Sequence, residues 1–334
     1  MTRVAVIGTG VMGRNHARVL RELGEVDLVG LADADLDAAC QVAAVHNTRG
    51  YGSHQELLER ERPDAVIVAA PTNSHHTVVM DALAAGCHVL VEKPIAATLE
   101  EADELVARAA AANRVLAVGH IERYNPAVIE LKRRLDEGQL GRLFQLNARR
   151  LGPFPQRIRD VGVVVDLATH DLDVMRYLTG SEIVRVYAET RREVHTTRED
   201  LVSGLLRFED GAVGVLQINW LTPSKIRELA VTGERGMFRA DYLTQDLYFH
   251  ENASAAEHNW QQITMLRGVS EGSMEQYAIQ KREPLRSELE AFLRAAAGDA
   301  SGIVSGEDGR KALRLALALV ESGAEGRVVT IGPS

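Results

Sequence analysis

Residues 3–13 read Arg-Val-Ala-Val-Ile-Gly-Thr-Gly-Val-Met-Gly, an apolar run that passes directly into a glycine-rich turn. The run predicts a short buried strand, and helical spacing begins just after the turn. Glycines at this spacing allow a tight turn, a close approach of the backbone to a pyrophosphate and close helix packing. The stretch therefore predicts a dinucleotide-binding turn rather than a purely structural one. The residues expected to contact the dinucleotide there are Gly8, Gly10, Val11, Met12 and Gly13.

The second predicted strand, at residues 26–32, ends next to Asp33. A carboxylate at this position accepts hydrogen bonds from the ribose hydroxyls of an adenosine group. Its charge would repel a 2′-phosphate, and the neighbouring Ala34 and Asp35 supply no arginine to neutralise one. Asp33 therefore favours NAD over NADP as the cofactor.

Strands and helices alternate through roughly the first 120 residues. Strands are predicted at residues 3–7, 26–32, 64–69, 89–91 and 115–119, with helices at 15–23, 35–45, 74–85 and about 98–113. Thr98 and Glu101 have the spacing of a capping box at the start of the last of these helices. Such alternation predicts an α/β fold, a doubly wound parallel sheet of the Rossmann type with right-handed crossovers.

The pattern changes after Gly119, where predicted strands follow one another with only turns between them. These strands lie at residues 144–151, 183–190, 201–208, 212–220, 227–232 and 247–250, and helices are expected at 166–178, 285–297 and 309–322. Residues 209–211, Glu-Asp-Gly, predict a hairpin turn. We therefore expect a Rossmann domain at residues 1–120 and an α+β domain with an open, mostly antiparallel sheet at residues 121–334.

The composition excludes several classes of function. The chain of 334 residues carries a net charge of −9, which disfavours nonspecific binding to nucleic acid or to a membrane surface, since both require a basic field. Cys40 and Cys87 are the only cysteines, which argues against a disulfide framework or a cysteine zinc site. With no leader or membrane-spanning pattern in the sequence, a cytoplasmic location is expected.

The tripeptide Glu92-Lys93-Pro94 follows a strongly apolar predicted strand. Ligand sites in open α/β sheets lie at the carboxyl ends of the strands, so Lys93 is a candidate for proton chemistry. Pro94 fixes its own φ and favours an extended Lys93, which restricts the direction in which the lysine side chain leaves the sheet. The competing interpretation is a surface lysine in an ordinary strand-to-helix loop.

A second acid–base cluster lies at residues 166–173, Asp-Leu-Ala-Thr-His-Asp-Leu-Asp, at the start of a predicted helix. Helical spacings of four and three place Asp166, His170 and Asp173 on one face. A carboxylate beside an imidazole favours its charged form and orients its tautomer, which suits a proton acceptor near neutral pH. Two alternatives stay open: a solvated polar face, and a zinc or manganese site, which lacks further His or Cys ligands at fixed spacing nearby.

Residues 71–76, Pro-Thr-Asn-Ser-His-His, follow another predicted sheet strand and begin a helix. At this place, contact with the edge of a cofactor is a better explanation of the histidines than metal binding. The residues expected to lie against the cofactor, besides the glycine turn and Asp33, are Pro71, Thr72, Asn73, His75, Glu92 and Lys93. No metal site is predicted.

Together these motifs resemble the Gfo/Idh/MocA oxidoreductase family, and they occur in family order over essentially the whole chain. The matching pieces are residues 8–13, 71–75 and 92–94, and Asp166 with His170 and Asp173. The resemblance implies an N-terminal Rossmann domain and a C-terminal α+β domain for substrate binding. It also implies oligomers formed through the C-terminal sheet, as a homodimer or homotetramer.

The resemblance further places Lys93, Asp166 and His170 at the positions of the family's catalytic lysine, aspartate and histidine. The chain departs from the family pattern at Ala168, where glycine is usual. It also lacks a full glycine run before the aspartate, of which only Gly162 remains. These departures affect backbone packing more than the chemistry of the three side chains.

Residues 119–126, Gly-His-Ile-Glu-Arg-Tyr-Asn-Pro, resemble the form of this segment found in nucleotide-sugar 3-dehydrogenases, especially those that act on UDP-N-acetylglucosamine. The segment leaves the last predicted Rossmann strand at the domain junction. Arg123, Tyr124 and Asn125 are therefore candidates to face the substrate, as is Asp173 on the acid–base helix. A purely structural junction is the alternative.

Arginines also gather just before the acid–base helix of this acidic chain, at Arg149, Arg150, Arg157 and Arg159. Guanidinium groups bind a diphosphate through bidentate, charge-assisted hydrogen bonds. We therefore expect Arg149, Arg157 and Arg159 to be substrate ligands. A solvated basic loop or a subunit contact is the competing interpretation.

These residues predict an NAD-dependent dehydrogenase of a secondary hydroxyl, with C3 of a UDP-sugar such as UDP-N-acetylglucosamine as the first substrate hypothesis. Loss of hydride requires loss of the hydroxyl proton, which His170 beside Asp166 can accept while Lys93 stabilises the oxygen. Lys93 is also a credible base, because the cationic nicotinamide lowers the pKa of a nearby lysine. The alternatives are a dehydrogenase of a free sugar or inositol, and a noncatalytic NAD-dependent regulator.

Overall fold

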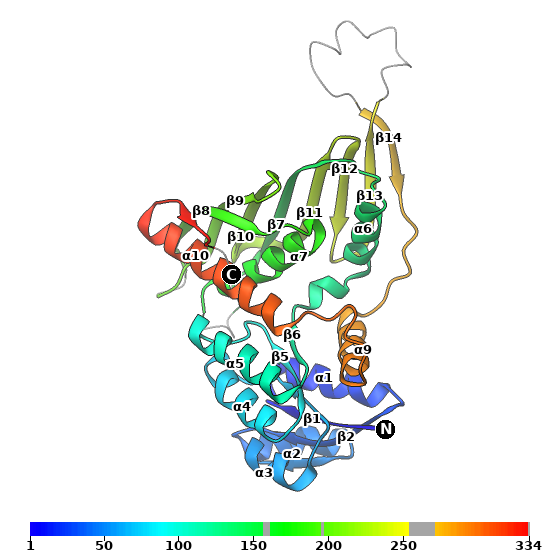
Figure 1. The fold of residues 1–334 in the computed structure, drawn as a ribbon, viewed down its shortest axis with the longest axis vertical. Coiled ribbons are helices and arrows are strands. Elements are labelled where there is room, and N and C mark those ends of the chain that lie inside the picture. Colours follow the sequence, from blue (N-terminus) through cyan, green and yellow to red (C-terminus); the bar gives the residue numbers. More distant parts are fainter. Residues whose placement is uncertain (156–160, 195–196, 254–270, 333–334) are drawn as a thin grey trace, which may run out of the picture. The chain divides into compact units, whose positions relative to one another are not determined.

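The computed structural model describes residues 1–155, 161–194, 197–253 and 271–332 (Figure 1). The chain folds into two compact units, one formed by Met1–Ile121 with Glu283–Arg314 and the other by Glu122–Arg282 with Leu315–Ser334. The predicted division into residues 1–120 and 121–334 therefore differs from the structure near the C-terminus. Residues 283–314 group with the first unit because Leu285 and Phe292 are buried in its core.

The first unit contains a six-stranded parallel sheet in the order β3-β2-β1-β4-β5-β6 (Figure 1). Its strands are β1 (Thr2–Ile7), β2 (Val26–Ala32), β3 (Arg49–Tyr51), β4 (Ala65–Val68), β5 (His88–Glu92) and β6 (Leu116–Gly119). The strand order changes direction between β1 and β4, which is the switch point where open α/β sheets bind ligands. The predicted Rossmann-type sheet is confirmed.

Helices cover both faces of this sheet. They are α1 (Val11–Glu22), α2 (Leu36–Val45), α3 (His54–Glu61), α4 (Thr72–Ala84), α5 (Leu99–Ala112) and α9 (Pro284–Ala296). Leu20 of α1 and Leu289 of α9 share a core with Val4 and Ile67 of the sheet. On the other face, α4 packs on β4 and β5 and lies between α3 and α5. The predicted capping box is confirmed, since Thr98 Oγ1 accepts a hydrogen bond from the Glu101 backbone N–H at 3.2 Å.

The second unit is built on a nine-stranded sheet in the order β14-β13-β12-β11-β7-β10-β9-β8-β15. The strands are β7 (Leu143–Pro153), β8 (Ile183–Arg191), β9 (Leu201–Phe208), β10 (Val213–Asn219), β11 (Leu221–Gly233), β12 (Gly236–Asp241), β13 (Asp246–Asn252), β14 (Glu271–Gln276) and β15 (Val329–Thr330). Neighbouring strands of the described sheet run antiparallel except β7 with β10, which are parallel. The predicted mostly antiparallel sheet is therefore confirmed.

The predicted hairpin at residues 209–211 is confirmed as well, between the antiparallel strands β9 and β10. Gly211 has a φ of +94°, a backbone conformation that glycine adopts without strain. The Asp210 side chain accepts a hydrogen bond from the Ala212 N–H at 3.0 Å, as expected for a turn residue of this type.

Helices pack on one face of the second sheet (Figure 1). After the 3₁₀ turn η1 (Ile121–Tyr124), the helical elements of this unit are α6 (Pro126–Asp136), the π-helix η2 (Val164–Ala168) and α7 (Thr169–Thr179). Leu131 of α6 and Met175 of α7 share a core with Leu146 of β7. The last helix, α10 (Gly306–Glu325), contributes residues up to Arg314 to the first unit and its remainder to the second. No helix of the described ranges has the length and apolar character needed to cross a membrane.

Candidate active site

The glycine turn between β1 and α1 has two glycines that the surrounding backbone requires. Gly8 has a φ of +97°, and a Cβ there would lie 2.4 Å from the carbonyl oxygen of Ala69. A Cβ at Gly13 would lie 1.8 Å from the carbonyl oxygen of Gly8. Gly10 is different, because no heavy atom of the described chain lies within 4 Å of a Cβ added there. Packing explains Gly8 and Gly13, while Gly10 leaves open space for a ligand.

The N-terminus of α1 adds the second requirement of an anion site. Its N-cap is Gly10, which has no side chain to cap the first N–H groups, and no acidic residue occupies the first turn. Arg14 is exposed, and its Nε donates to the Thr9 carbonyl at 2.9 Å, which braces the turn. Free N–H groups at a helix N-terminus bind phosphate. The residues present therefore fit the pyrophosphate of a dinucleotide.

Asp33 lies at the end of β2 and is hydrogen-bonded to the glycine turn. Its Oδ2 accepts from the Thr9 backbone N–H at 2.7 Å and from the Thr9 hydroxyl at 2.8 Å. Burial acts to raise the pKa of Asp33, but the hydrogen bonds from Thr9 and Asp35 outweigh it and hold that pKa below its usual value. The carboxylate is therefore ionised at neutral pH and fixed beside the turn, which suits a ribose diol.

Lys93 follows the last residue of β5 and is half-buried, and the Lys93–Pro94 peptide bond is cis. The loop is held from α4 by His75, which is only 1% exposed. His75 Nδ1 lies 2.8 Å from the carbonyl oxygen of Pro94, and its Nε2 lies 2.9 Å from that of Ala70. Burial lowers the pKa of His75. Both ring nitrogens thus lie beside backbone carbonyls, and the neutral ring donates its single N–H to one of them. His75 therefore supports the lysine loop, and its predicted contact with the cofactor stays a prediction.

The other residues predicted along the cofactor edge divide into two groups. Pro71 and Asn73 are exposed and Thr72 is half-buried at the start of α4, where a ligand can reach them. Glu92 is buried, and its Oε1 accepts a 2.8 Å hydrogen bond from His16 Nε2 in α1. Burial acts to raise the pKa of Glu92, but the bond from His16 outweighs it and lowers that pKa. The Glu92 side chain is therefore an interior anion, and the predicted contact of this residue with the cofactor stays a prediction.

The acid–base pair of the second unit lies where a π-helix meets an α-helix. Asp166 belongs to η2 and His170 to the first turn of α7, and they are 8% and 9% exposed. The sequence predicted a regular helix from residue 166, whereas a π-helix occupies residues 164–168. Single π-turns occur often at functional sites, because they change the direction in which side chains leave a helix. Asp166 is therefore held on a short, irregular element, and His170 lies in the α-helix that directly follows it.

The start of η2 is anchored by Glu199, which the sequence did not single out. Its carboxylate oxygen Oε1 accepts from the Val164 N–H at 3.2 Å, and its backbone carbonyl accepts from the Val163 N–H at 2.9 Å. A Cβ on Gly162 would lie 2.0 Å from the same Oε1. This explains why a glycine stands there. No local pattern could have pointed to Glu199, since it follows η2 by more than 30 residues.

The predicted substrate residues of the junction contact one another. Arg123 forms a bidentate ion pair with Asp173, with Nε 2.6 Å from Oδ2 and Nη2 2.5 Å from Oδ1. Asp173 is fully buried, so Arg123 is the counter-charge that its burial requires. Tyr124 is buried, and Asn125 caps α6 by accepting from the Ala127 N–H at 3.1 Å. In the structure these residues support the second unit from within, and their predicted contact with a substrate stays a prediction.

The arginine cluster is divided by the alternation of β7. Arg149 points to the face of the sheet opposite the helices and pairs with Glu228 at 3.0 Å, while Arg150 points to the helical face. Arg150 is buried and pairs with Asp171 at 2.7 Å and with Glu122 at 2.8 Å. Arg149 was predicted as a substrate ligand; here its guanidinium pairs with Glu228, and the substrate contact stays a prediction. Arg157 and Arg159 lie outside the described residues.

Metal binding has no support in the described ranges. No group of three or more His, Cys, Asp or Glu side chains in them is arranged to hold an ion. The candidate catalytic side chains are instead the amine of Lys93, the imidazole of His170 and the carboxylate of Asp166, which are groups that transfer protons.

Comparison with known proteins assigns both units. Residues 2–120 match the model of the oxidoreductase family with an NAD-binding Rossmann fold, and residues 128–239 match the GFO/IDH/MocA C-terminal domain. The chain belongs to the Gfo/Idh/MocA oxidoreductase family. The family predicted from the motifs is thereby confirmed. The chain is an NAD-binding oxidoreductase, and its named relatives are dehydrogenases that act on hydroxyl groups.

Several relatives span nearly the whole chain, and two of them are described here. UDP-N-acetylglucosamine 3-dehydrogenase of Acidithiobacillus ferrooxidans is 32% identical over 315 residues, which cover 94% of this chain and 95% of that one. Its solved structure has a TM-score of 0.84 and covers 96% of this chain and 97% of its own. Myo-inositol 2-dehydrogenase of Thermotoga maritima is 27% identical over 342 residues, 98% of each chain.

A solved oxidoreductase from Agrobacterium radiobacter, in complex with NAD+, L-tartaric acid and magnesium, is 21% identical, with a TM-score of 0.83 and 98% of both chains covered. At this identity the likeness shows the fold alone. The Gfo/Idh/MocA fold of this chain is thus shared with relatives of several named activities.

Proposed function

We propose that the chain is an NAD-dependent dehydrogenase that oxidises a secondary hydroxyl of a nucleotide sugar, with C3 of UDP-N-acetylglucosamine as the first candidate. The observation that carries this proposal is the 32% identity with UDP-N-acetylglucosamine 3-dehydrogenase over 94% of the chain. The glycine turn and the lysine loop lie in residues 2–120, which match the NAD-binding family model, and the acid–base element lies in residues 128–239, which match the C-terminal model. The proposal joins these three features in one reaction.

The cofactor is assigned to the first unit. The glycine turn and the N-terminus of α1 hold the pyrophosphate, and Asp33 accepts hydrogen bonds from the adenosine ribose. The ionised Asp33 disfavours a 2′-phosphate, so NAD is proposed over NADP. When bound, NAD supplies the acceptor for the hydride that leaves the sugar carbon.

The protons are assigned to Lys93 and to the pair His170 and Asp166. His170 accepts the hydroxyl proton, and Asp166 stabilises the resulting imidazolium. Lys93 donates a hydrogen bond to the substrate oxygen as negative charge develops on it. In the reverse assignment Lys93 is the base and His170 stabilises the oxygen. The two assignments predict different pH profiles of turnover for variants of Lys93 and of His170.

The first experiment mixes the purified chain with NAD+ and UDP-N-acetylglucosamine and follows NADH by its absorbance. Lys93→Met and His170→Asn are measured beside it, together with NAD+ binding by titration calorimetry. We expect NADH formation in the wild type, with NAD+ binding retained and turnover lost by roughly 10²–10⁴-fold in both variants. Unchanged turnover in Lys93→Met, with cofactor bound, would contradict the catalytic assignment.

A dehydrogenase of a free inositol or sugar is the second candidate. It is favoured by the 27% identity with myo-inositol 2-dehydrogenase over 98% of the chain and by the commitment of Arg123 and Arg150 to buried carboxylates. Neither guanidinium is then available to a diphosphate. NADH formation with myo-inositol and none with UDP-N-acetylglucosamine would decide for this candidate.

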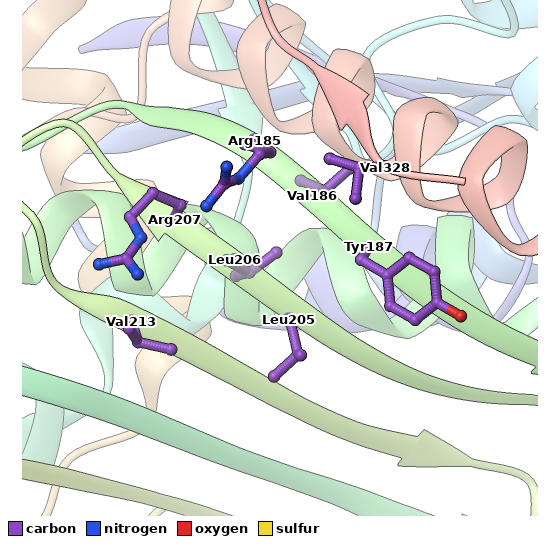
Figure 2. Close-up of a pocket in the computed structure, with 8 residues that line it drawn as sticks. All are labelled: Arg185, Val186, Tyr187, Leu205, Leu206, Arg207, Val213 and Val328. Atoms are coloured by element: carbon purple, nitrogen blue, oxygen red, sulfur yellow. The ribbon is translucent and has the colours of Figure 1, made fainter. Parts of the chain in front are cut away.

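We also propose that the chain forms a homodimer or homotetramer through the open face of the second sheet. Leu205 and Val328 are 52% and 49% exposed there, beside a hollow of about 300 Å³ on β8, β9 and β10. Figure 2 shows Arg185 and Arg207 together at one part of this hollow and Tyr187 apart from them. Light scattering tests the proposal: Leu205→Arg should lower the mass, and Leu243→Arg, at a similarly exposed turn leucine, should not.

A further inference from the structure

Three ionisable side chains gather inside the first unit, on elements that are far apart in sequence. His16 of α1 is fully buried, Glu92 of β5 is 9% exposed and Glu288 of α9 is 1% exposed. His16 Nε2 donates to Glu92 Oε1 at 2.8 Å, and the charge of Glu92 acts on Glu288. Glu92 directly precedes Lys93, so this cluster is part of the electrostatic surroundings of the lysine.

Glu288 differs from Glu92 in its hydrogen bonds. Both of its carboxyl oxygens are inaccessible to solvent, and neither has a hydrogen-bond partner among the described residues. An ionised carboxylate is strongly disfavoured in such a place, whereas a protonated carboxyl loses much less on burial. Glu92 has the histidine, and Glu288 has a second carboxylate as its neighbour. Two acids that share one interior cannot both ionise at low cost.

The direction of the titration agrees with this geometry. Burial raises the pKa of Glu288 well above its usual value, and the negative charge of Glu92 raises it further. The groups that act on Glu92 in turn are His16, Lys93 and His75, all of which favour its ionised form. The cation and the histidines thus stabilise the charge on Glu92, and the proton remains on Glu288.

We propose that Glu288 is a positioning residue that is protonated at neutral pH and thereby keeps a single negative charge, on Glu92, beside Lys93. Ionisation of Glu288 would place a second negative charge beside Glu92, the residue that directly precedes the lysine. The link to catalysis rests on the role of Lys93 proposed above. The protonation of Glu288 does not, and it is measured without substrate.

Stability as a function of pH gives the first test. The pKa of a free glutamic acid is about 4.3. Between about pH 5 and pH 7, the folded chain therefore holds a proton on Glu288 that the unfolded chain has lost. The wild type must therefore lose stability relative to Glu288→Gln by about tenfold in the unfolding equilibrium constant per pH unit. Glu290→Gln is the control, because that carboxylate on the same helix is accessible and pairs with Arg286.

Three results would overturn the proposal in this experiment. The first is an equal pH dependence of the wild type and Glu288→Gln. The second is the same divergence in Glu290→Gln. The third is failure of Glu288→Gln to fold, since the neutral amide has nearly the shape of the neutral acid and should be accepted in its place.

Infrared spectroscopy gives the second test, and it uses the wild type directly. A protonated carboxyl has a carbonyl stretch that is separate from those of carboxylates and amides. We expect this band in the wild type at pH 7 and its loss in Glu288→Gln but not in Glu290→Gln. Glu92→Gln removes the neighbouring charge and should move the titration of the band to lower pH. A wild type without the band, or a band that survives in Glu288→Gln, overturns the proposal.

The pH profile of turnover connects the cluster to Lys93. Glu92→Gln should move the ascending limb to lower pH, because it removes the negative charge of the residue that directly precedes the lysine. Glu288→Gln should leave the limb in place, since it replaces one neutral group by another. A shift in Glu288→Gln would show that Glu288 is charged. If no substrate turns over, the proposed function fails, while the stability and infrared results still decide the state of Glu288.

Discussion

Nδ1 of His75 lies 2.8 Å from the carbonyl oxygen of Pro94, the residue that follows Lys93. The other ring nitrogen lies 2.9 Å from the carbonyl oxygen of Ala70, just after β4. One imidazole therefore joins the end of one central strand to the loop at the end of the next. Because the ring is buried, its position is fixed by packing, and the direction of the lysine loop is fixed with it.

His75→Ala should therefore impair catalysis more than cofactor binding. Removal of the ring leaves the buried carbonyl that accepts its N–H without a donor, which destabilises the fold by about 1–3 kcal/mol. We expect kcat to fall by tenfold or more, while the KM for NAD+ changes little, because the glycine turn is untouched. His75→Gln is the matched control, since its amide can donate to one carbonyl, and it should recover part of the loss. Equal changes in kcat and KM would contradict the positioning role.

The Thr9 and Asp33 pair predicts the cofactor preference. Asp33→Ala removes an ionised acceptor and two hydrogen bonds to Thr9. Hydrogen bonds to charged groups contribute about 1.5–3 kcal/mol, so the affinity for NAD+ should fall by roughly 10–100-fold. The ratio of the affinity for NAD+ to that for NADP+ should become smaller. Calorimetric titration with both cofactors measures this.

Asp35→Ala is the control for that experiment. Asp35 caps α2 by accepting from the Ala38 N–H at 3.1 Å and lies only two residues from Asp33. Loss of the cap should lower stability by about 1 kcal/mol and leave NAD+ affinity unchanged. An Asp33→Ala variant with wild-type affinity for NAD+ would exclude Asp33 as the ribose ligand.

The ion pair of Arg123 with Asp173 predicts a loss of stability where the sequence predicted a loss of substrate binding. Arg123→Ala leaves the fully buried Asp173 without a counter-charge, and breaking such a pair costs about 3–5 kcal/mol. Arg149→Ala, at an exposed pair on the opposite face of the sheet, should change stability by less than about 1 kcal/mol. Urea denaturation measures both. A higher KM in Arg123→Ala with unchanged stability would restore the substrate role.

Much of the fold could be predicted because its signals are local. The strands around residues 65–68 and 88–92 are continuous apolar runs, and Thr98 with Glu101 marks a helix start by itself. Several elements were not predicted, among them β3, α3 and α6. For β3 and α3 the reason is that three strand residues and a polar eight-residue helix give no clear period. The return of α9 to the first unit depends on contacts between residues more than 250 positions apart, which no local pattern contains.

Site residues could be predicted from the sequence only where the position of the residue along a strand or loop determines its place in the fold. Lys93 and Asp33 each follow an apolar strand that the sequence predicts, β5 and β2. Arg149 and Arg150 are neighbours in sequence, yet the pleat of β7 sends them to opposite faces. The residues that support the site, Glu199 and Glu288, come from distant segments and carry no motif. Their roles follow from burial and hydrogen bonding, which only the folded chain reveals.

Gly162 gives the last prediction. Gly162→Ala places a methyl group 2.0 Å from the present position of Glu199 Oε1, so that carboxylate must move and release the Val164 N–H. Leaving a buried donor unsatisfied destabilises by about 1–3 kcal/mol. Because η2 begins there and carries Asp166, turnover should fall as well. Gly24→Ala is the control, since the described structure has no atom within 4 Å of a Cβ at that position, and it should be nearly neutral.

A double-mutant cycle separates this clash from any other effect of the added methyl group. Glu199→Ala removes the carboxylate that the methyl group would meet, so Gly162→Ala should then add little to the destabilisation already caused by Glu199→Ala. We expect a coupling of about 1–3 kcal/mol between the two sites, as found for residues in direct contact. Additive losses would mean that the alanine disturbs η2 by another route, and the carboxylate of Glu199 would no longer explain the glycine at position 162.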